Sequence, residues 1–346
     1  MPGNPRRKIV RKDRGAVYHC WNRCVRGASL CGQDTRTGQD FSYRRHWVRT
    51  REEQLAALFA IEFAFHAEMA NHLHLVLRTR PDIARRWSPA EVVRRWLTIT
   101  RLAKAMGNDV PTPSPQKTKL LLRNKKKIAK LRRRLSSVSW LMGILCENIA
   151  RRANQEEDRK GKFWESRFQC RRCDSEAAIL VCGMYVDLNQ IRAGEAKTPE
   201  TSRYTSAFDR IQGRSQRSLK NRVDGWLCEL TLRDGPLEGL DSEYRSRSGR
   251  RASDQGLLSI RLEDYLQLLD WTGRQQRPGK RGAIPKSLAP ILDRLAICQD
   301  ALVDSLEHFD ELFGHVIGHP ADLQQAAAEM GVRWLKGQRA NRQLFK

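Results

Sequence analysis

The stretch Asn71-His72-Leu73-His74-Leu75-Val76-Leu77 alternates polar and apolar residues before it becomes wholly apolar. Side chains alternate between the two faces of a β-strand, so His72 and His74 are expected on one face and the leucines on the other. Two imidazoles on one face can bind one divalent cation, provided that each ring is neutral and a third group completes the site. A His-x-His pair on a strand is more often structural, so the pair alone does not decide between these interpretations.

A candidate third group lies in the segment 184–194, Met-Tyr-Val-Asp-Leu-Asn-Gln-Ile-Arg-Ala-Gly. This segment is expected to end a helix, which sets Tyr185 and Asn189 one turn apart on the same face. Tyr185 also lies on the apolar stripe of that helix, so a tyrosine of the core is the alternative interpretation. A tyrosine beside a bound cation would instead be a candidate nucleophile.

Four short motifs follow one another along the chain: YHCWNR at 18–23, MANHLH at 69–74, GKFWESRF at 161–168 and YVDLNQIRAG at 185–194. Their residues and their order resemble the motifs of REP-associated tyrosine transposases, a branch of the single-tyrosine HUH transposases. The resemblance covers roughly residues 15–78 and 136–210, and four ordered motifs are far more specific than any one of them.

Two positions depart from the family pattern. Ala70 stands where the family usually has proline, and Gln190 and Ile191 stand where it usually has Pro-Val. None of these positions supplies a catalytic atom. The chemistry is therefore expected to survive, while the strand entry and the helix end differ in shape.

The resemblance implies a fold, a site and an activity. The fold is that of HUH endonucleases, a ferredoxin-like or RRM-like antiparallel sheet with helices, within the α+β class. His72 and His74, with a side-chain oxygen of Asn189, would hold Mg²⁺ or Mn²⁺ against the scissile phosphate of single-stranded DNA. Tyr185 would attack the phosphorus, form a 5′-phosphotyrosine link and leave a free 3′-hydroxyl. The implied activity is DNA nicking and rejoining, for DNA transposition and recombination at palindromic hairpins.

The physical logic of such a site also stands without the family. A phosphodiester is anionic and resists attack by another anion, so a cation on its oxygens stabilises both the ground state and the transition state. A tyrosine has a pKa of about 10, which nearby positive charge lowers, and a phenolate leaves more readily than an alkoxide when the link is reversed. The sequence has no Gly-rich Walker-type loop, and rejoining through a phosphotyrosine needs no ATP.

Three other functions remain open at this stage. One is a nucleic-acid-binding module that keeps the fold but has lost the chemistry. Another is a rolling-circle replication initiator or relaxase, which uses the same metal and tyrosine on a replication origin. The third is a metal-independent RNA-binding regulator, which a preference for RNA would reveal.

The charge of the chain indicates a polyanionic partner. Its 64 Lys and Arg exceed its 39 Asp and Glu, which gives a formal net charge of +25 and predicts strong, salt-sensitive binding to polyanions. Nucleic acid is favoured over a membrane, because no apolar run approaches the roughly 18 residues of a spanning helix and no signal-peptide pattern is present. A cytoplasmic, nucleoid-associated protein is therefore expected.

Nine cysteines are scattered along the chain, and reduced thiols in a cytoplasm are the simplest account of them. Cys170 and Cys173 have zinc-like spacing, and Cys20 and Cys24 would complete a four-thiolate site if the two segments were adjacent. A second CxxC is missing, so isolated cysteines remain the default interpretation.

The hydrophobic patterns predict the order of the elements. Residues 16–25 alternate as a half-buried strand, residues 43–59 read as a helix, and residues 61–76 as two strands that turn near 69–71. This strand, helix, strand, strand order is typical of a ferredoxin-like antiparallel sheet. Residues 139–156 and 177–188 are predicted as further helices, the second ended by Gly194.

Residues 79–135 read as a basic helical insertion. Residues 117–134 contain ten Lys and Arg and no acidic residue, with leucines and isoleucines spaced as in one basic amphipathic helix. These basic residues are expected to contact phosphate; the alternative is that they form the solvent-exposed face of a structural helical hairpin. Arg23 and Arg192 lie within family motifs, and Trp164 and Arg167 suit base stacking and phosphate contact. The candidate DNA-contacting residues are Arg23, Lys125, Lys126, Lys127, Arg132, Arg133, Arg134, Trp164, Arg167 and Arg192.

The chain divides into three parts on composition. Residues 1–240 are predicted to form the catalytic domain, 241–256 a Ser, Arg and Gly-rich linker, and 257–346 a mostly helical C-terminal domain. Residues 326–332 resemble the helix-turn step of a helix-turn-helix. The alternative interpretation is a plain helical hairpin. This C-terminal region is assigned to DNA hairpin recognition or to support of a homodimer.

Overall fold

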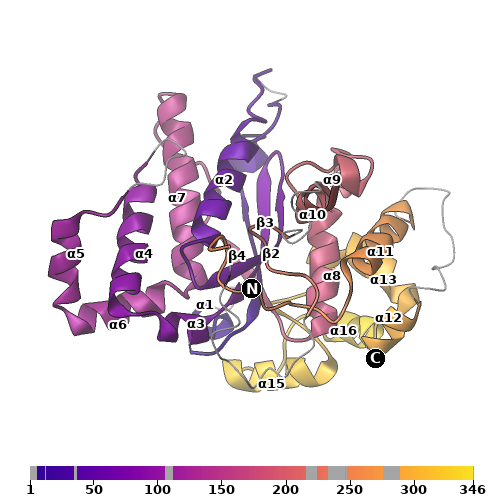
Figure 1. Cartoon of the computed structure of the whole chain (residues 1–346). Coiled ribbons are helices and arrows are strands. Elements are labelled where there is room, and N and C mark those ends of the chain that lie inside the picture. Colours follow the sequence, from indigo (N-terminus) through magenta and orange to yellow (C-terminus); the bar gives the residue numbers. More distant parts are fainter. Residues whose placement is uncertain are drawn as a thin grey trace.

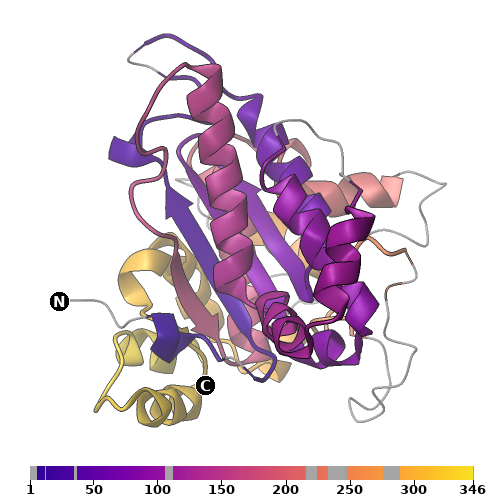
Figure 2. The same ribbon diagram turned by 90° about the vertical axis from the view of Figure 1, so that its left-hand side faces the viewer.

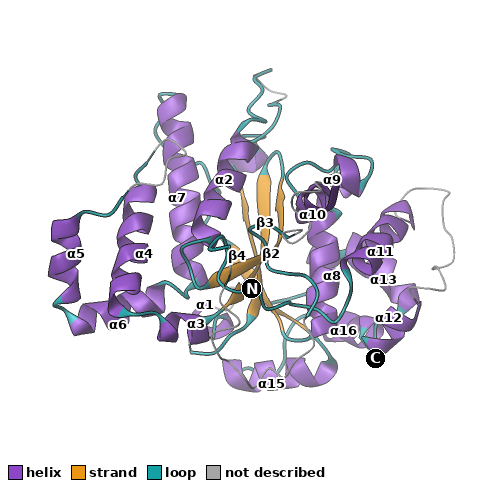
Figure 3. Ribbon diagram, in the orientation of Figure 1, coloured by secondary structure: helices purple, strands orange, loops and turns teal. Residues whose placement is uncertain are grey.

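The computed structural model describes residues 6–11, 13–34, 37–105, 112–215, 224–232, 246, 248–275 and 289–345. Its centre is a five-stranded sheet in the order β2-β3-β1-β4-β5, with helices on both faces (Figures 1 and 3). The strands are β1 Val17–Arg23, β2 Ile61–Glu68, β3 His72–Thr79, β4 Gln169–Cys173 and β5 Val316–Ile317.

The α+β class predicted from the sequence is confirmed, but the prediction of a purely antiparallel sheet is wrong. β1 pairs antiparallel with β3 and β4, and β2 pairs antiparallel with β3. β5 joins β4 in parallel through Val316 and Ile317. The sheet is therefore mixed, because the C-terminal region supplies an edge strand that a two-residue apolar pair does not reveal in the sequence.

The helices form two layers. One face of the sheet carries α2 and α7, with α4, α5 and α6 beyond them, and the opposite face carries α8, with α10, α11 and α13 beside it (Figure 1). A view turned by 90° shows α7 lying in front of the strands (Figure 2). The helices of these layers are α2 Arg44–Ala56, α4 Pro89–Leu102, α5 Pro115–Leu122, α6 Lys125–Arg134, α7 Val138–Glu156, α8 Glu176–Asp187, α10 Ser206–Ser215, α11 Leu262–Gln275 and α13 Gln299–Glu307.

The remaining helices are short or peripheral, and α15 lies below the sheet in Figure 1. No helix in the described part of the chain is long and apolar enough to span a membrane. These elements are α1 Arg6–Ile9, η1 Val25–Gly27, α3 Pro81–Arg86, α9 Asn189–Arg192, η2 Pro199–Thr201, α12 Ala289–Arg294, α14 Phe309–Leu312, α15 Pro320–Met330 and α16 Gln338–Leu344.

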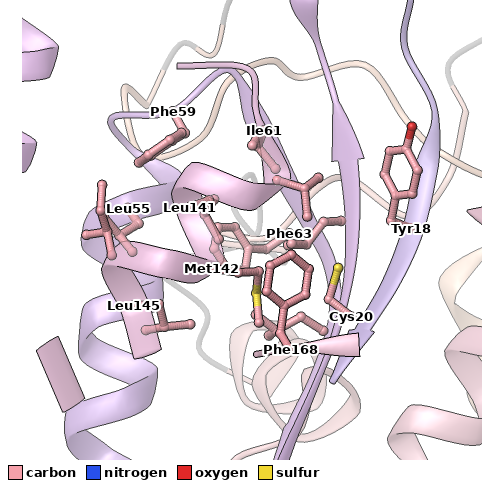
Figure 4. Packing of buried hydrophobic residues seen from close by; sticks show 14 of the residues in the cluster. Tyr18, Cys20, Leu55, Phe59, Ile61, Phe63, Leu141, Met142, Leu145 and Phe168 are labelled. Carbon is pink, nitrogen blue, oxygen red and sulfur yellow. The ribbon is translucent and has the colours of Figure 1, made fainter. Parts of the chain in front are cut away.

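Each face of the sheet has its own hydrophobic core. Leu73, Leu75 and Leu77 of β3 belong to the cluster that packs on α2 and α7. Figure 4 shows other members of this cluster, among them Leu55 of α2 and Leu141 of α7. Val76 belongs to the second cluster, together with α8. Because both faces are covered, β2 and β3 are buried almost along their whole length, although β2 carries the polar residues Glu62, His66 and Glu68.

Most helix and strand boundaries predicted for the N-terminal part are confirmed within a few residues. The prediction of one continuous basic helix at 117–134 is wrong. The chain forms α5 and α6, separated by Arg123 and Asn124. The side chain of Asn124 accepts a hydrogen bond from the backbone N–H of Lys127 at 2.9 Å, so it acts as the N-cap of α6. An asparagine that caps a new helix therefore interrupts an otherwise continuous amphipathic pattern.

Part of the stretch predicted as a linker packs on the sheet. Ser253 and Gln255 are buried, and the guanidinium of Arg78 donates to the carbonyls of Gln255 and Gly256 at 2.8 and 2.9 Å. Residues 241–245 and 247 of that stretch lie outside the described residues. The described end of the stretch is thus fixed against β3.

The predicted helix-turn-helix step has a different geometry from that motif. α15 ends at Met330, and Gly331 follows with the positive φ of 65° that favours glycine. Residues 331–337 separate α15 from α16, whereas the motif has a turn of about three or four residues. Ala340 and Leu344 of α16 are buried, so the second helix packs on the protein.

The four cysteines considered for zinc do not come together. Cys20 and Cys170 are paired in register between β1 and β4 and share the core that faces α7. Cys173 is three residues further along β4, so it points to the opposite face, where its free thiol is hydrogen-bonded with that of Cys182. The two thiols of the CxxC motif therefore lie on different sides of the sheet.

Candidate active site

Three histidines meet on the face of the sheet that α8 covers. β3 places His72 opposite Arg23 and His74 opposite Trp21, and His19 of β1 lies on the same face. The ring centroids of His72 and His74 are 4.8 Å apart, and those of His74 and His19 are 5.0 Å apart. The predicted alternation of β3 is confirmed, and it brings both histidines of the motif side by side.

One nitrogen of each motif histidine already has a hydrogen-bond partner. Nδ1 of His74 is 2.8 Å from Nε2 of His19, and Nδ1 of His72 is 2.6 Å from Oδ1 of Asn71. Such contacts fix the orientation of a ring and its tautomer, as outer partners do for metal-binding histidines. The Nε2 atoms of both rings are left as the candidate ligand atoms.

Burial keeps both rings neutral. Desolvation, and then the charge of Arg23, lowers the pKa of His72 to about 4. Desolvation, and then the neighbouring His72 and His19, lowers the pKa of His74 well below its usual value. Neutral imidazoles offer a lone pair at pH 7, which is the form that a metal ion requires.

Tyr185 lies against these rings from α8. Its ring centroid is 5.5 Å from that of His74 and stacks at 4.1 Å on Phe309 of α14. Its hydroxyl donates a hydrogen bond of 2.8 Å to Oδ2 of Asp310. Burial, and then the charge of Asp310, raises the pKa of Tyr185 to about 12, so the phenol is protonated at neutral pH.

The short helix α9 brings two further predicted residues to the same place. The side chain of Asn189 hydrogen-bonds with His72, and the guanidinium of Arg192 lies 4.4 Å over the ring of Tyr185. Nδ2 of Asn189 and Nη1 of Arg192 are buried and have no hydrogen-bond partner among the described residues. Two unsatisfied donors beside a phenol are suited to bind an anion.

Sequence reasoning missed two residues of the site, Arg171 and Asp310. Nη2 of Arg171 on β4 is 2.7 Å from Oδ1 of Asp310, and its guanidinium stacks over Trp21 at 4.5 Å. Arg171 is 3% exposed, which for an arginine requires an internal partner. The sequence Gln-Cys-Arg-Arg-Cys of β4 has no alternation that indicates a strand, and nothing near Asp310 in the sequence connects it with Tyr185.

The other candidate DNA-contacting residues near the site differ in exposure. Arg23 and Arg167 are exposed. Trp164 is half-buried, packs against the core and donates from Nε1 to the carbonyl of Cys146 at 2.8 Å. Base stacking by Trp164 therefore competes with its contacts inside the protein.

The basic residues of α6 are not equivalent. Lys125, Lys126, Lys127 and Arg133 are exposed, whereas Nη1 of Arg132 donates to the carbonyls that end α3, including that of Trp87 at 2.6 Å. The guanidinium of Arg134 lies 4.0 Å over the ring of Trp140. α6 and α9 lie on opposite sides of the sheet (Figure 1), so the exposed lysines are remote from Tyr185.

Two cavities are lined by basic residues, and one of them includes Arg192 of the site. One, of about 500 Å³, begins at Val25, just beyond the end of β1, and is lined by the basic residues Arg26, Arg159, Lys160 and Lys162. The other, of about 580 Å³, is lined by Arg192 and Lys197. The first hollow also contains Asp34 and Glu157 and the second contains Glu307, so basic residues outnumber acidic ones by two and by one.

Comparison of the chain with family models, with curated proteins and with solved structures gave no match. The assignment of a function therefore depends on the residues of the site.

Proposed function

We propose that the protein is a metal-dependent, single-stranded DNA endonuclease and strand transferase of the transposase type, with Tyr185 as the nucleophile. The observation that carries the proposal is the contact of the Tyr185 ring with the neutral His74, whose ring lies beside that of His72, and with Arg192, whose buried Nη1 lacks a partner among the described residues. A nucleophile, a cation site and an anion site thus coincide at one point.

The strand order also supports the family resemblance. The antiparallel order β2-β3-β1-β4, with α2 between β1 and β2 and α7 before β4, is that of a ferredoxin-like sheet. In this sheet the His-x-His strand, β3, lies between β2 and β1. We therefore propose the HUH endonuclease fold for this domain.

The residues present are compatible with a divalent cation. Nε2 of His72 and of His74 and the side-chain oxygen of Asn189 would hold Mg²⁺ or Mn²⁺, both of which accept such nitrogen and oxygen donors. The bound cation would polarise the phosphate oxygens as a Lewis acid.

The remaining chemistry belongs to the side chains. As the oxygen of Tyr185 bonds to phosphorus, its proton passes to Oδ2 of Asp310, and the bond to the 3′-oxygen breaks, leaving a 3′-hydroxyl after protonation by water. The guanidiniums of Arg192 and Arg171 offset the negative charge that develops on the phosphate. Because Tyr185 is 2% exposed, we propose that side chains around its hydroxyl rearrange when a phosphate binds.

The direct test is incubation of the protein with a library of single-stranded DNA hairpins and Mn²⁺, followed by mapping of covalent adducts. We expect adducts at discrete positions beside palindromic hairpins. Adducts confined to a replication origin would favour a rolling-circle initiator or relaxase. Binding without any adduct would indicate a module that has lost the chemistry, and a preference for RNA would indicate an RNA-binding regulator.

We predict that Asp310→Asn slows cleavage by about 100-fold or more, in the range typical of a lost proton acceptor. The amide keeps the size of the carboxylate but holds a proton far less well. Single-turnover cleavage with saturating DNA measures this step. Asp304→Asn, at an exposed carboxylate of α13, is the control, and an unchanged rate in Asp310→Asn would exclude a role in proton transfer.

We also predict that the exposed lysines of α6 supply affinity without affecting the rate. Replacing Lys125, Lys126, Lys127 and Arg133 by Gln should flatten the plot of log affinity against log salt by about 0.7 per lost phosphate contact. Arg132 and Arg134 stay unchanged, because they hold α3 and Trp140. A salt dependence identical to that of the wild type would show that α6 does not touch DNA.

A further inference from the structure

A second polar cluster lies inside the protein, on the face of the sheet opposite to Tyr185. It consists of Glu52 of α2 with His66 and Glu68 of β2, whose residues are 0%, 0% and 2% exposed. Nδ1 of His66 is 2.9 Å from Oε1 of Glu68 and 3.9 Å from Oε2 of Glu52. Two carboxylates thus converge on one imidazole nitrogen in a site closed to water.

Several oxygens of this cluster are unsatisfied. Both carboxylate oxygens of Glu52 and Oε2 of Glu68 are buried and have no hydrogen-bond partner among the described residues. Burying an ionised carboxylate without a partner costs several kcal/mol, so native proteins pair such groups or use them to coordinate metals. The cluster therefore needs a cation or a proton to be stable.

The surroundings of His66 orient it as a ligand. Its Nε2 is 3.3 Å from Oδ2 of Asp209, and Asp209 is itself held by Arg49 at 2.8 Å and by Nε1 of Trp226 at 3.2 Å. A carboxylate on one ring nitrogen fixes the tautomer and leaves the other nitrogen, Nδ1, to coordinate. Nδ1 is the atom that faces Glu52 and Glu68.

We propose that Glu52, His66 and Glu68 bind a divalent transition-metal ion of the Zn²⁺ or Mn²⁺ type. Their ligand atoms lie within 4.8 Å of one another, and one imidazole nitrogen with two carboxylate oxygens is a donor set that these ions accept. The inference does not depend on the nuclease function.

This ion is distinct from one held by His72 and His74. Glu68 pairs with Leu73 and His66 with Leu75, so both side chains share the face that packs on α2. His72 and His74 occupy the alternate positions of β3 and face α8. The ion would tie α2 to the last residue of β2, where the chain turns toward His72, and its role is structural.

The alternative to a metal ion is a proton. Burial, and then the nearby Glu68, raises the pKa of Glu52 well above its usual value. Burial lowers the pKa of His66, but Glu68 and Asp209 outweigh it and raise that pKa to about 9, so in the metal-free cluster Glu52 and His66 both hold a proton at neutral pH, which a bound metal ion would displace. A protonated cluster and a metal-bound cluster contain the same residues but differ in metal content, which can be measured directly.

The experiment uses the full-length protein with the double substitution His72→Ala and His74→Ala, which removes the other candidate site. After removal of metal with a chelator, the protein is incubated with ZnCl₂ or MnCl₂, desalted and analysed by mass spectrometry of the elements. We expect about one equivalent of metal per chain and a higher melting temperature than that of the metal-free protein.

Adding Glu52→Gln or Glu68→Gln to this background should abolish the uptake, whereas Glu147→Gln, at an exposed carboxylate of α7, should retain it. X-ray absorption at the zinc edge needs no substitution within the cluster and should show nitrogen and oxygen ligands that include one imidazole. Absence of uptake by the double variant, uptake that survives both glutamine substitutions, or a sulfur-containing shell would each overturn the proposal.

Discussion

Tyr185→Phe should leave the protein folded and able to bind single-stranded DNA, yet yield no covalent protein–DNA adduct. The substitution removes one oxygen and keeps the ring that stacks on Phe309 and touches His74. The lost hydrogen bond to Asp310 costs about 1 kcal/mol, and Asp310 keeps its ion pair with Arg171. The phenol oxygen is the only atom whose loss removes the nucleophile.

The measurement is a denaturing gel of labelled hairpin DNA incubated with Mn²⁺, in which a phosphotyrosine link shifts the label to the mass of the protein. Tyr43→Phe is the matched control, because Tyr43 is 44% exposed on the surface and should retain the adduct. A covalent product from Tyr185→Phe would refute attack by this tyrosine. Cleavage by the wild type without an adduct at any time would favour a metal-activated water as the nucleophile.

The second large effect is expected at the histidines. His72→Ala and His74→Ala should each slow cleavage by about 100- to 1000-fold, the range seen when one electrostatic stabiliser of a transition state is lost. DNA affinity should change little, because the basic surface supplies it. Both values are obtained from one preparation, by filter binding without metal and by cleavage with Mn²⁺.

The control for the histidines is His46→Ala, since His46 is exposed on α2, where Nε2 of its ring lies 3.5 Å from the hydroxyl of Thr50. His74 is packed between His19 and Tyr185, so the melting temperature of His74→Ala must be compared with that of the wild type. Equal cleavage by wild type and both variants at saturating Mn²⁺ would remove the metal-site assignment.

The sequence was sufficient where a local pattern determines the geometry. The alternation at residues 71–77 places His72 and His74 on one face of a strand, and the four-residue spacing places Tyr185 and Asn189 on one side of a helix end. Both placements follow from the periodicity of side chains along one strand or one helix. The contact between the strand and the helix end depends on tertiary structure. In the sequence, only the order of the four motifs indicated that contact.

The sequence was insufficient where an element is short or a contact is distant. β5 has two residues and β4 carries two arginines among its five, so neither has the apolar alternation of a predictable strand. Arg132 reads as a phosphate-binding residue because it belongs to a basic run, but three backbone carbonyls take its donors. Composition alone cannot distinguish a basic side chain that bonds the last carbonyls of another helix from a basic side chain that is exposed to solvent.

The distance along the chain between Tyr185 and Asp310 has a consequence during synthesis. The two residues are separated by 125 positions, so at about 5–20 residues per second a ribosome needs roughly 6–25 seconds to proceed from the tyrosine to the aspartate. During that interval the emerging chain contains the histidines and the phenol, while their proton acceptor and the stacked Phe309 do not yet exist. The Tyr185 phenol and the histidines of the nascent chain therefore lack the cover of Phe309 and the hydrogen bond of Asp310 for many seconds.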